Sequence, residues 1–305
     1  MAQTQSLRLA RVRRQLAYAV RDVAQDGFLA AKKPVSCFWW DMHPNFGDEF
    51  TPFLLPRYGF MPLLRPPDEA RFFGVGSIIN MSSATTDAVI WGSGVMHADR
   101  VSARPNSQVV ALRGHLSQQA MNVHGPIALG DPGLLASRWI RRSPRTGVVG
   151  LVLHYSHARQ DFAHVLRSHL SGSVRFIDPA RPLDHVVTAI NSCDAILTTS
   201  LHGLVVADSY GIPAVWSLPE PVLPGGAFKF DDYESVVEPR RSRRVDIEDM
   251  TSTDAIRRAA ATVNGAAVRH AVMGLEDSLL SLHAAYTTTA PTASRLWHQY
   301  KYLLG

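Results

Sequence analysis

The residues of this chain that could bind or transform a ligand share one position, because each group comes directly after a short apolar run. The groups are Asn45, Gly47 and Asp48; Ser93 and Gly94; Arg113; His154 and Tyr155; and Ser200 with His202. Parallel strands end at the same edge of a sheet, and α/β proteins bind their ligands at that edge. The placement therefore predicts one shared site.

The residue types in these groups suit a ligand that carries both a carboxylate and a phosphate. A guanidinium such as that of Arg113 binds either anion through two parallel hydrogen bonds. Glycines such as Gly47 and Gly94 let backbone N–H groups approach an anion closely. Asp48 and His202 add one carboxylate and one imidazole, which could accept and donate protons.

Residues 197–213 predict the end of a strand, a sharp turn and a buried helix. Ser200 suits the N-cap of that helix, and Gly211 suits the position past its end. His202 then falls in the first helical turn, where free N–H groups and the helix dipole favour an anion. The alternative is a structural histidine whose neighbours satisfy it.

Each other candidate also has a structural interpretation. Asp48 could cap a helix, Arg113 could pair with a surface carboxylate, and Gly94 could serve a turn. Asp131, which precedes Pro132, is interpreted as structural. The remaining histidines lack the spacing of metal ligands, and two cysteines cannot form a cysteine zinc site, so we expect no metal.

Short apolar runs alternate with helical patterns along the chain, which indicates parallel sheets covered by helices. The first half predicts strands at 36–40, 71–75, 88–91, 108–112 and 127–129, with helices at 47–58 and 115–123. The second half predicts strands at 148–154, 174–177, 194–198 and 214–217, with helices at 158–170, 183–191 and 201–210 and a loop over the cleft at 219–232.

These series predict an α/β fold with two Rossmann-like domains that face each other across a cleft, a GT-B-like architecture. The expected divisions are a basic amphipathic N-terminal helix in 1–33, an acceptor-side domain in 34–145, a donor-side domain in 146–290 and a helical tail in 291–305. The Arg, Ser, Pro and Gly residues of 141–147 indicate the linker. Helices near 253–263 and 271–286 are expected to complete the second domain.

Composition favours a globular protein of the cytoplasm. The formal net charge of +5 fits an anionic partner, and part of that charge lies in the N-terminal helix, which could contact an anionic membrane surface. The basic clusters lack interleaved aromatic residues, which argues against nucleic-acid binding. Two cysteines predict no disulfide framework, and no apolar run is long enough for a transmembrane helix.

An ordered set of motifs over roughly residues 36–237 resembles the polysaccharide pyruvyl transferase family. The motifs are Trp40 with Asn45 to Asp48, Ile90 to Gly94, Leu112 to Gly114, Leu129 to Pro132, Leu153 to Tyr155, Thr199 to Gly203, Ala207 to Pro213 and Phe228 to Tyr233. The resemblance implies a GT-B-like fold and transfer of pyruvate from phosphoenolpyruvate onto a sugar, which yields a pyruvate ketal and phosphate. Family acceptors are sugars of surface polysaccharides, often on a lipid carrier, and no cofactor is implied.

This resemblance suggests roles for the candidate residues. His202 would protonate the methylene carbon of phosphoenolpyruvate, Asp48 would handle the sugar hydroxyls and Arg113 would hold the donor. Asn45, Gly47, Ser93, Gly94, His154, Tyr155, Ser200 and Lys229 would bind the substrates. Some relatives carry Arg-Leu-His where this chain has Ser200, so Lys229 or an arginine of 240–244 is expected to bind the donor phosphate instead.

Two other functions compete with this hypothesis. A GT-B glycosyltransferase that uses a nucleotide sugar would have the same architecture. A non-catalytic module that binds a sugar or an anion would tolerate replacement of Asp48, Arg113 and His202 one at a time. If the protein is a pyruvyl transferase, we expect it to act in the cytoplasm. A further hypothesis is that it contacts the inner face of the cell membrane.

Overall fold

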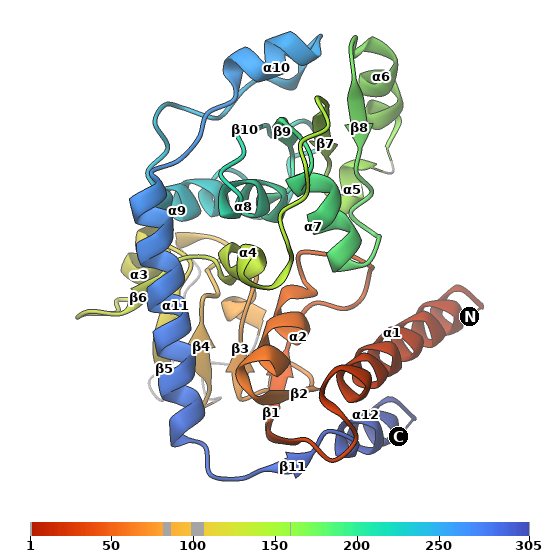
Figure 1. Ribbon diagram of the computed structural model, residues 1–305, viewed down its shortest axis with the longest axis vertical. Coiled ribbons are helices and arrows are strands. Elements are labelled where there is room, and N and C mark those ends of the chain that lie inside the picture. Colours follow the sequence, from red (N-terminus) through yellow and green to blue (C-terminus); the bar gives the residue numbers. More distant parts are fainter. Residues whose placement is uncertain (1, 82–86, 99–106, 159, 305) are drawn as a thin grey trace.

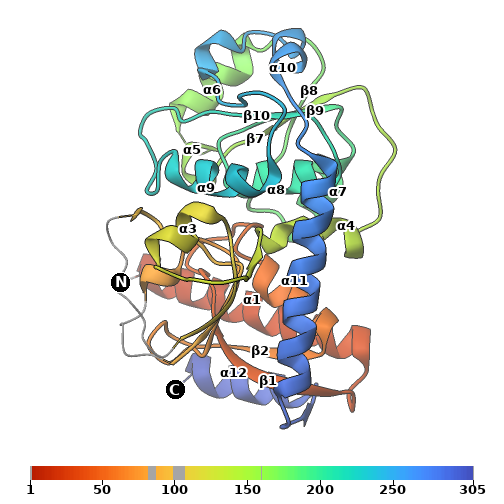
Figure 2. The ribbon, with the colours of Figure 1, turned by 90° about the vertical axis from the view of Figure 1, so that its left-hand side faces the viewer.

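The computed structural model of the 305-residue chain describes residues 2–81, 87–98, 107–158 and 160–304, which form an α/β protein with two mainly parallel sheets (Figure 1). One sheet is built largely from the first half of the chain, and the other from the second half. The longest helices, α1 and α11, both lie against the first-sheet part of the molecule (Figure 2).

The first sheet has the strand order β11-β1-β3-β4-β5-β6, and β2 also pairs with β1. All pairings are parallel except that of β11, which lies antiparallel to β1. Its strands are β1 (Ala31–Phe38), β2 (Phe60–Leu64), β3 (Phe72–Phe73), β4 (Val89–Trp91), β5 (Gln108–Leu112), β6 (Ala128–Leu129) and β11 (Ala290–Pro291).

The second sheet is parallel throughout and has the order β10-β9-β7-β8. Its strands are β7 (Val149–Val152), β8 (Val174–Phe176), β9 (Ala195–Thr198) and β10 (Ala214–Trp216). The chain leaves β7 toward β8 on one side and returns to β9 on the other. The carboxyl ends of β7 and β9 therefore form a topological switch point, where open α/β sheets bind ligands.

Helices connect these strands and cover the sheets. They are α1 (Ala2–Asp26), α2 (Phe50–Leu54), α3 (His115–Ala120), α4 (Ala136–Trp139), α5 (Tyr155–Ala158), α6 (Asp161–His169), α7 (Leu183–Asn191), α8 (Leu201–Ser209), α9 (Phe228–Val237), α10 (Thr253–Ala259), α11 (Gly265–Ala285) and α12 (Ser294–Leu304). Short 3-10 turns occupy Leu55–Tyr58, Ile79–Met81, Pro132–Leu135 and Ile247–Asp249.

Several predicted elements are confirmed, others differ, and one strand was not predicted. The helix expected at 47–58 is a five-residue α2 followed by a 3-10 turn, because Pro56 cannot continue the α-helical hydrogen bonds. Strand β2 was not predicted, since Pro62 lies inside it, yet all five of its residues are buried. The loop expected at 219–232 ends early, because α9 begins at Phe228.

The long helix α11 does not complete the second domain as expected. It packs against β5 and β6 of the first sheet, and its buried side chains include Leu275 and Leu279. The indole Nε1 of Trp91 donates to the Leu275 carbonyl at 3.1 Å, which ties β4 to this helix. Its apolar side therefore packs mainly on the first-sheet part of the molecule, along which the ribbon of α11 runs in Figure 2.

The two ends of the chain lie side by side on the first-sheet part (Figure 1). As predicted, the C-terminal tail is helical and packs back on the first half, where α12 lies against α1 and β2. The basic helix α1 is docked through Arg11, whose Nε lies 2.6 Å from Asp41 Oδ2, and through buried Tyr18 and Asp22. Across the described residues, no helix combines the length and apolarity needed to span a membrane.

Candidate active site

A cavity of about 310 Å³ lies at the switch point between β7 and β9 and is lined by both halves of the chain. Its volume is at the lower end of the usual range for small-molecule sites. Seven of the eleven predicted site residues line it: Asn45, Asp48, His154, Tyr155, Ser200, His202 and Lys229. The structure thus brings together residues up to 184 positions apart (229 − 45) in the sequence.

The N-terminus of α8 forms one wall of this cavity through Ser200, Leu201 and His202. Ser200 has an extended backbone, and its N–H donates to Thr198 Oγ1 at 2.9 Å. The Ser200 hydroxyl makes no capping bond to the helix. The first turn of α8 therefore offers backbone N–H groups and the positive end of the helix dipole to an anion in the cavity.

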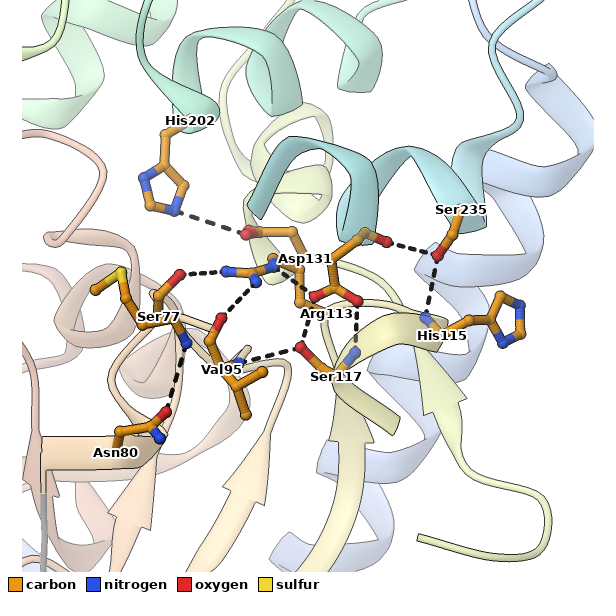
Figure 3. A network of polar contacts seen from close by, with 11 residues as sticks. Ser77, Asn80, Val95, Arg113, His115, Ser117, Asp131, His202 and Ser235 are labelled. Carbon is orange, nitrogen blue, oxygen red and sulfur yellow. Dashed lines mark hydrogen bonds and ion pairs between the residues drawn. The ribbon is translucent and has the colours of Figure 1, made fainter. Parts of the chain in front are cut away.

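The imidazole of His202 is held between two aromatic rings and a carboxylate. Its side chain lies against Phe46 and Phe50, with ring centroids 6.4 and 6.0 Å away. Its Nε2 lies 3.7 Å from Asp131 Oδ2, and both atoms are buried without a hydrogen-bond partner (Figure 3). Burial lowers the pKa of His202, while the Asp131 carboxylate acts in the opposite direction.

Asp48 and Asn45 form a polar pair that also lines the cavity. Asn45 Nδ2 donates to Asp48 Oδ2 at 2.7 Å, and the N–H of Asp48 donates to the Asn45 carbonyl at 3.1 Å. Burial raises the pKa of Asp48 to about 7, although the hydrogen bond from Asn45 favours the ionised form. This carboxyl can therefore exchange a proton near neutral pH.

Lys229, near the start of α9, supplies the positive charge of the cavity. Of the residues that line the cavity, all of which are described, it is the only lysine or arginine. Its side chain is largely buried, and burial together with the nearby Arg113 lowers its pKa to about 8, while Asp48 opposes the shift. A cation so poorly hydrated binds an incoming anion more strongly than an exposed lysine would.

His154 and Tyr155 follow β7, and their rings pack against each other with centroids 4.6 Å apart and planes tilted by 42°. The Nδ1 of His154 accepts from the Ser156 N–H at 3.3 Å, so its proton lies on Nε2. Burial and the neighbouring Lys229 lower the pKa of His154 to about 3. His154 is thus a neutral hydrogen-bonding group at neutral pH, unsuited to carry a positive charge.

Arg113 does not reach the cavity wall, contrary to its predicted contact with the donor. Its Nε pairs with Asp232 Oδ2 at 2.8 Å, its Nη2 donates to the Val95 carbonyl at 2.9 Å and its Nη1 donates to Ser77 Oγ (Figure 3). Both charged side chains are fully buried. Arg113 is therefore committed to Asp232, which lies 119 positions further along the chain.

The other predicted residues outside the cavity wall shape it indirectly. Ser93 is buried and its hydroxyl donates to the Gly74 carbonyl. A Cβ at Gly94 would lie 2.2 Å from Arg113 Cζ, and a Cβ at Gly47 would lie 2.0 Å from His202 Nδ1. These glycines thus leave room for the functional side chains, and neither lines the cavity itself.

The arginines of 240–244 do not line the cavity either. Arg243 is buried and pairs with Asp208 and Glu234, each at 2.7 Å. Since Asp208 is on α8 and Glu234 on α9, this arginine fixes the two helices to each other. Lys229 is consequently the predicted substitute cation that the structure brings to the cavity.

Sequence reasoning missed two parts of the site. The first is the pairing of Asp131 with His202, which the spacing of 71 positions (202 − 131) concealed. The second is an apolar wall that includes Ile78, Met96 and Leu223. The glycines that follow β3, Gly74 and Gly76, were a usable signal for the loop that supplies part of this wall.

A metal-binding group is not found among the residues that the structure describes, since no three His, Cys, Asp or Glu side chains converge there. Cys37 and Cys193 are both buried free thiols. The cavity itself combines a helix N-terminus with a lysine, an imidazole and a carboxyl, which are groups that suit an anion.

Comparison with known proteins identifies the family of this chain. The family described as polysaccharide pyruvyl transferase matches residues 84–218. The uncharacterized protein L143 of Acanthamoeba polyphaga mimivirus is 30% identical over 220 residues, which are 67% of this chain and 75% of that protein. The succinoglycan biosynthesis protein ExoV of Rhizobium meliloti is 24% identical over 224 residues, 69% of this chain and 67% of ExoV.

This chain belongs to the polysaccharide pyruvyl transferase family. It is thus a member of a family of transferases that act on polysaccharide. An uncharacterized protein of Klebsiella pneumoniae matches 74% of this chain and 96% of its own at 11% identity, with a TM-score of 0.39. An alpha-glucosyltransferase solved with UDP and DNA matches 90% of this chain and 100% of its own at 7% identity, with a TM-score of 0.32. Neither structural score is high enough to support a conclusion.

Proposed function

We propose that this protein transfers pyruvate from phosphoenolpyruvate onto two hydroxyls of one sugar in a surface polysaccharide or its lipid-linked precursor, forming a ketal and releasing phosphate. The observation that carries the proposal is the convergence of the α8 N-terminus, Lys229 and His202 on one cavity. An anion-binding helix end, a cation and a proton donor are what a phosphorylated enol carboxylate needs.

The donor phosphate would lie at the first turn of α8 with Lys229 beside it. Ser200 leaves this helix end free of a side-chain cap, so its N–H groups stay available. Lys229 would supply the positive charge beside this helix end. The donor carboxylate would be bound by the remaining polar groups of the cavity, among them the neutral His154.

The atoms and protons of the proposed reaction balance with the residues that line the cavity. Protonated His202 gives a proton to the methylene carbon, which becomes a methyl group, and a sugar hydroxyl attacks the cation formed at the neighbouring carbon. Phosphate then leaves, and a second hydroxyl of the same sugar closes the ketal. Of the two hydroxyl protons, one leaves with hydrogenphosphate and one restores His202. Asp48, with its pKa near 7, relays these protons.

The two-domain, GT-B-like division would assign the acceptor to the first-half side of the cavity and the donor to the second-half side. Asn45 and Asp48 come from the loop after β1, whereas Ser200, His202 and Lys229 come from α8 and α9. Arg113 would act on the donor through α9. It binds Asp232, one helical turn beyond Lys229, and so fixes the lysine in place.

A lipid-linked acceptor would require work at a membrane surface, and α1 is the proposed contact at the inner face of the cell membrane. Leu9 and Val20 on this helix are more than half exposed, and Arg13 is exposed between them. Sedimentation with vesicles containing anionic lipid should therefore weaken when Leu9 and Val20 are both changed to Ser. Unchanged sedimentation would contradict this part of the proposal.

Phosphate release from phosphoenolpyruvate tests the function directly. A panel of aryl glycosides and lipid-linked sugars should contain an acceptor that triggers release of one phosphate per ketal. In D₂O the methyl group of the ketal should carry one deuterium, because His202 draws its proton from solvent. No release with any acceptor, together with stabilisation of the protein by a nucleoside diphosphate, would favour the glycosyltransferase alternative.

A further inference from the structure

Asp131 and His202 are two buried groups whose facing atoms are both unpaired. Asp131 Oδ2 and His202 Nε2 lie 3.7 Å apart, and neither atom has a hydrogen-bond partner in the part of the chain that the structure describes. Asp131 is fully buried, and His202 is 7% exposed. A buried polar atom without a partner is costly, so two such atoms facing each other indicate a contact that a small rotation of the ring completes.

Asp131 is rigidly held, so it can orient the histidine. Its other carboxylate oxygen, Oδ1, accepts the N–H of Gly133 at 2.8 Å and caps the 3-10 turn Pro132–Leu135. That turn is fixed to α8 by the Ser209 hydroxyl, which donates to the Leu134 carbonyl at 2.8 Å. The carboxylate is therefore anchored to the helix that carries His202.

The opposite edge of the imidazole faces the loop that carries Asn45 and Asp48. A Cβ at Gly47 would lie 2.0 Å from His202 Nδ1, so Nδ1 is directed at this loop. Figure 3 shows Nδ1 pointing away from Asp131. Phe46 and Phe50 flank the ring and restrict its rotation. The two nitrogens therefore have different surroundings.

We propose that Asp131 is a positioning residue that holds the proton of His202 on Nε2 and leaves Nδ1 as the nitrogen that exchanges a proton with the ligand. The identity of that ligand rests on the proposed function, but the tautomer does not. When His202 is protonated, its Nε2–H stays on Asp131 and its Nδ1–H is the proton delivered to the methylene carbon. The N–H bond at Nδ1 breaks as the C–H bond forms, and a hydroxyl proton later restores it.

Replacement of Asp131 by Asn reverses this arrangement. The Asn side chain can still accept the Gly133 N–H through its oxygen, but it now presents N–H donors toward Nε2. His202 must then accept at Nε2 and place its single proton on Nδ1. A neutral ring of this kind cannot accept a proton at Nδ1, so turnover should fall by about 10²–10⁴-fold, as in enzymes whose histidine is locked in the wrong tautomer.

The ¹⁵N chemical shifts of His202 in the ligand-free protein test the assignment, with the signals identified by their loss in His202→Gln. Titration should be monitored as well, because Asp131, Lys229 and Arg113 all act on the charge of the ring. The wild-type protein should show a neutral Nε2–H ring, and Asp131→Asn a Nδ1–H ring. Ser209→Ala, which loosens the same turn without touching the carboxylate, should keep the wild-type tautomer.

A wild-type ring protonated on Nδ1 would overturn the proposal without any variant, as would an unchanged tautomer in Asp131→Asn. Kinetics provides the second readout: kcat should fall in Asp131→Asn while the KM for phosphoenolpyruvate changes less than about threefold. Equal kcat in the two proteins would also overturn it. If the tautomers are as proposed but phosphoenolpyruvate is not a substrate, the proposed function fails and the pairing stands.

Discussion

Two buried acid–base pairs lie close together in this protein, and they differ in how completely they are hydrogen-bonded (Figure 3). Around Arg113 and Asp232, both carboxylate oxygens and three guanidinium nitrogens have partners, including both the N–H and the hydroxyl of Ser117. Between His202 and Asp131, the facing atoms have none. The hydrogen bonds of the first pair are therefore all made, whereas the facing atoms of the second pair can still bind a ligand or a proton.

The difference separates a supporting network from reactive groups. A buried pair that is fully hydrogen-bonded holds elements in place, and here it fastens α9 to the loop after β5, where a Cβ at Gly114 would lie 1.8 Å from the Asp232 carbonyl oxygen. An incompletely satisfied pair of which one member, here His202, lines a cavity is typical of functional sites. We therefore expect the two pairs to respond to mutation in opposite ways.

His202→Gln should show the largest effect on activity and a small one on stability. Gln keeps a polar side chain but cannot deliver a proton, so phosphate release should fall by about 10³-fold. The melting temperature should stay within about 2 °C of the wild type, because the glutamine amide can still donate to the Asp131 carboxylate. Activity near the wild-type level would show that His202 is not the acid.

Arg113→Ala should show the converse, with a loss of about 3–5 kcal/mol in the free energy of unfolding, because it leaves the Asp232 carboxylate buried without its cation. Chemical denaturation measures this loss. The double variant Arg113→Met with Asp232→Leu should recover part of the stability, because it removes the uncompensated carboxylate but leaves the buried Ser117 donors unpaired. Its activity should stay low, since Lys229 is no longer fixed. Full activity in the double variant would contradict the supporting role of this pair.

These contrasts also explain what the sequence could and could not predict. Strand β5 and helix α7 were predicted at their observed bounds, because an uninterrupted apolar run and an amphipathic period are local signals. The strand-end groups identified most of the polar residues that line the cavity, since topology alone brings strand ends together. The partner of Arg113 could not be read, because Asp232 approaches it only after the chain has folded.

The observed packing of helix α11 differs from the expected packing for a related reason. Its apolar period is visible in the sequence, but no local signal tells which sheet that apolar face will cover. Because α11 follows the linker, it was expected to pack in the second domain, but in the structure it packs against β5 and β6. Which sheet a helix covers can be told only from the folded structure, whereas the types of the site residues can be taken from the sequence alone.

The pH dependence of phosphoenolpyruvate binding should follow Lys229. Lys229, with its pKa near 8, must stay protonated to bind phosphate, so the affinity should fall above pH 8. Lys229→Arg should move this loss of affinity to higher pH, because guanidinium stays charged. Calorimetric titration at a series of pH values measures the change, and an unmoved loss of affinity would contradict the role of Lys229.

The smallest expected effect is on stability and comes from Asp48. Its pKa is higher in the folded protein than the model-compound value of 3.8, so its ionisation opposes folding as pH rises from about 4 through 7. Asp48→Asn should therefore stabilise the protein at pH 8 by on the order of 2 kcal/mol relative to its effect at pH 4. Asp277→Asn, which changes an exposed carboxylate on α11, should show little such difference.

Calorimetric titration with phosphoenolpyruvate tests the central claim most directly, because it needs no acceptor. The account predicts binding to the wild-type protein that weakens by about 10–100-fold in Lys229→Ala, the loss expected when a buried charged partner is removed from an anion. Arg240→Ala, which removes an exposed cation outside the cavity, should bind as the wild type does. Equal binding by Lys229→Ala, or no binding by the wild type, would contradict the account.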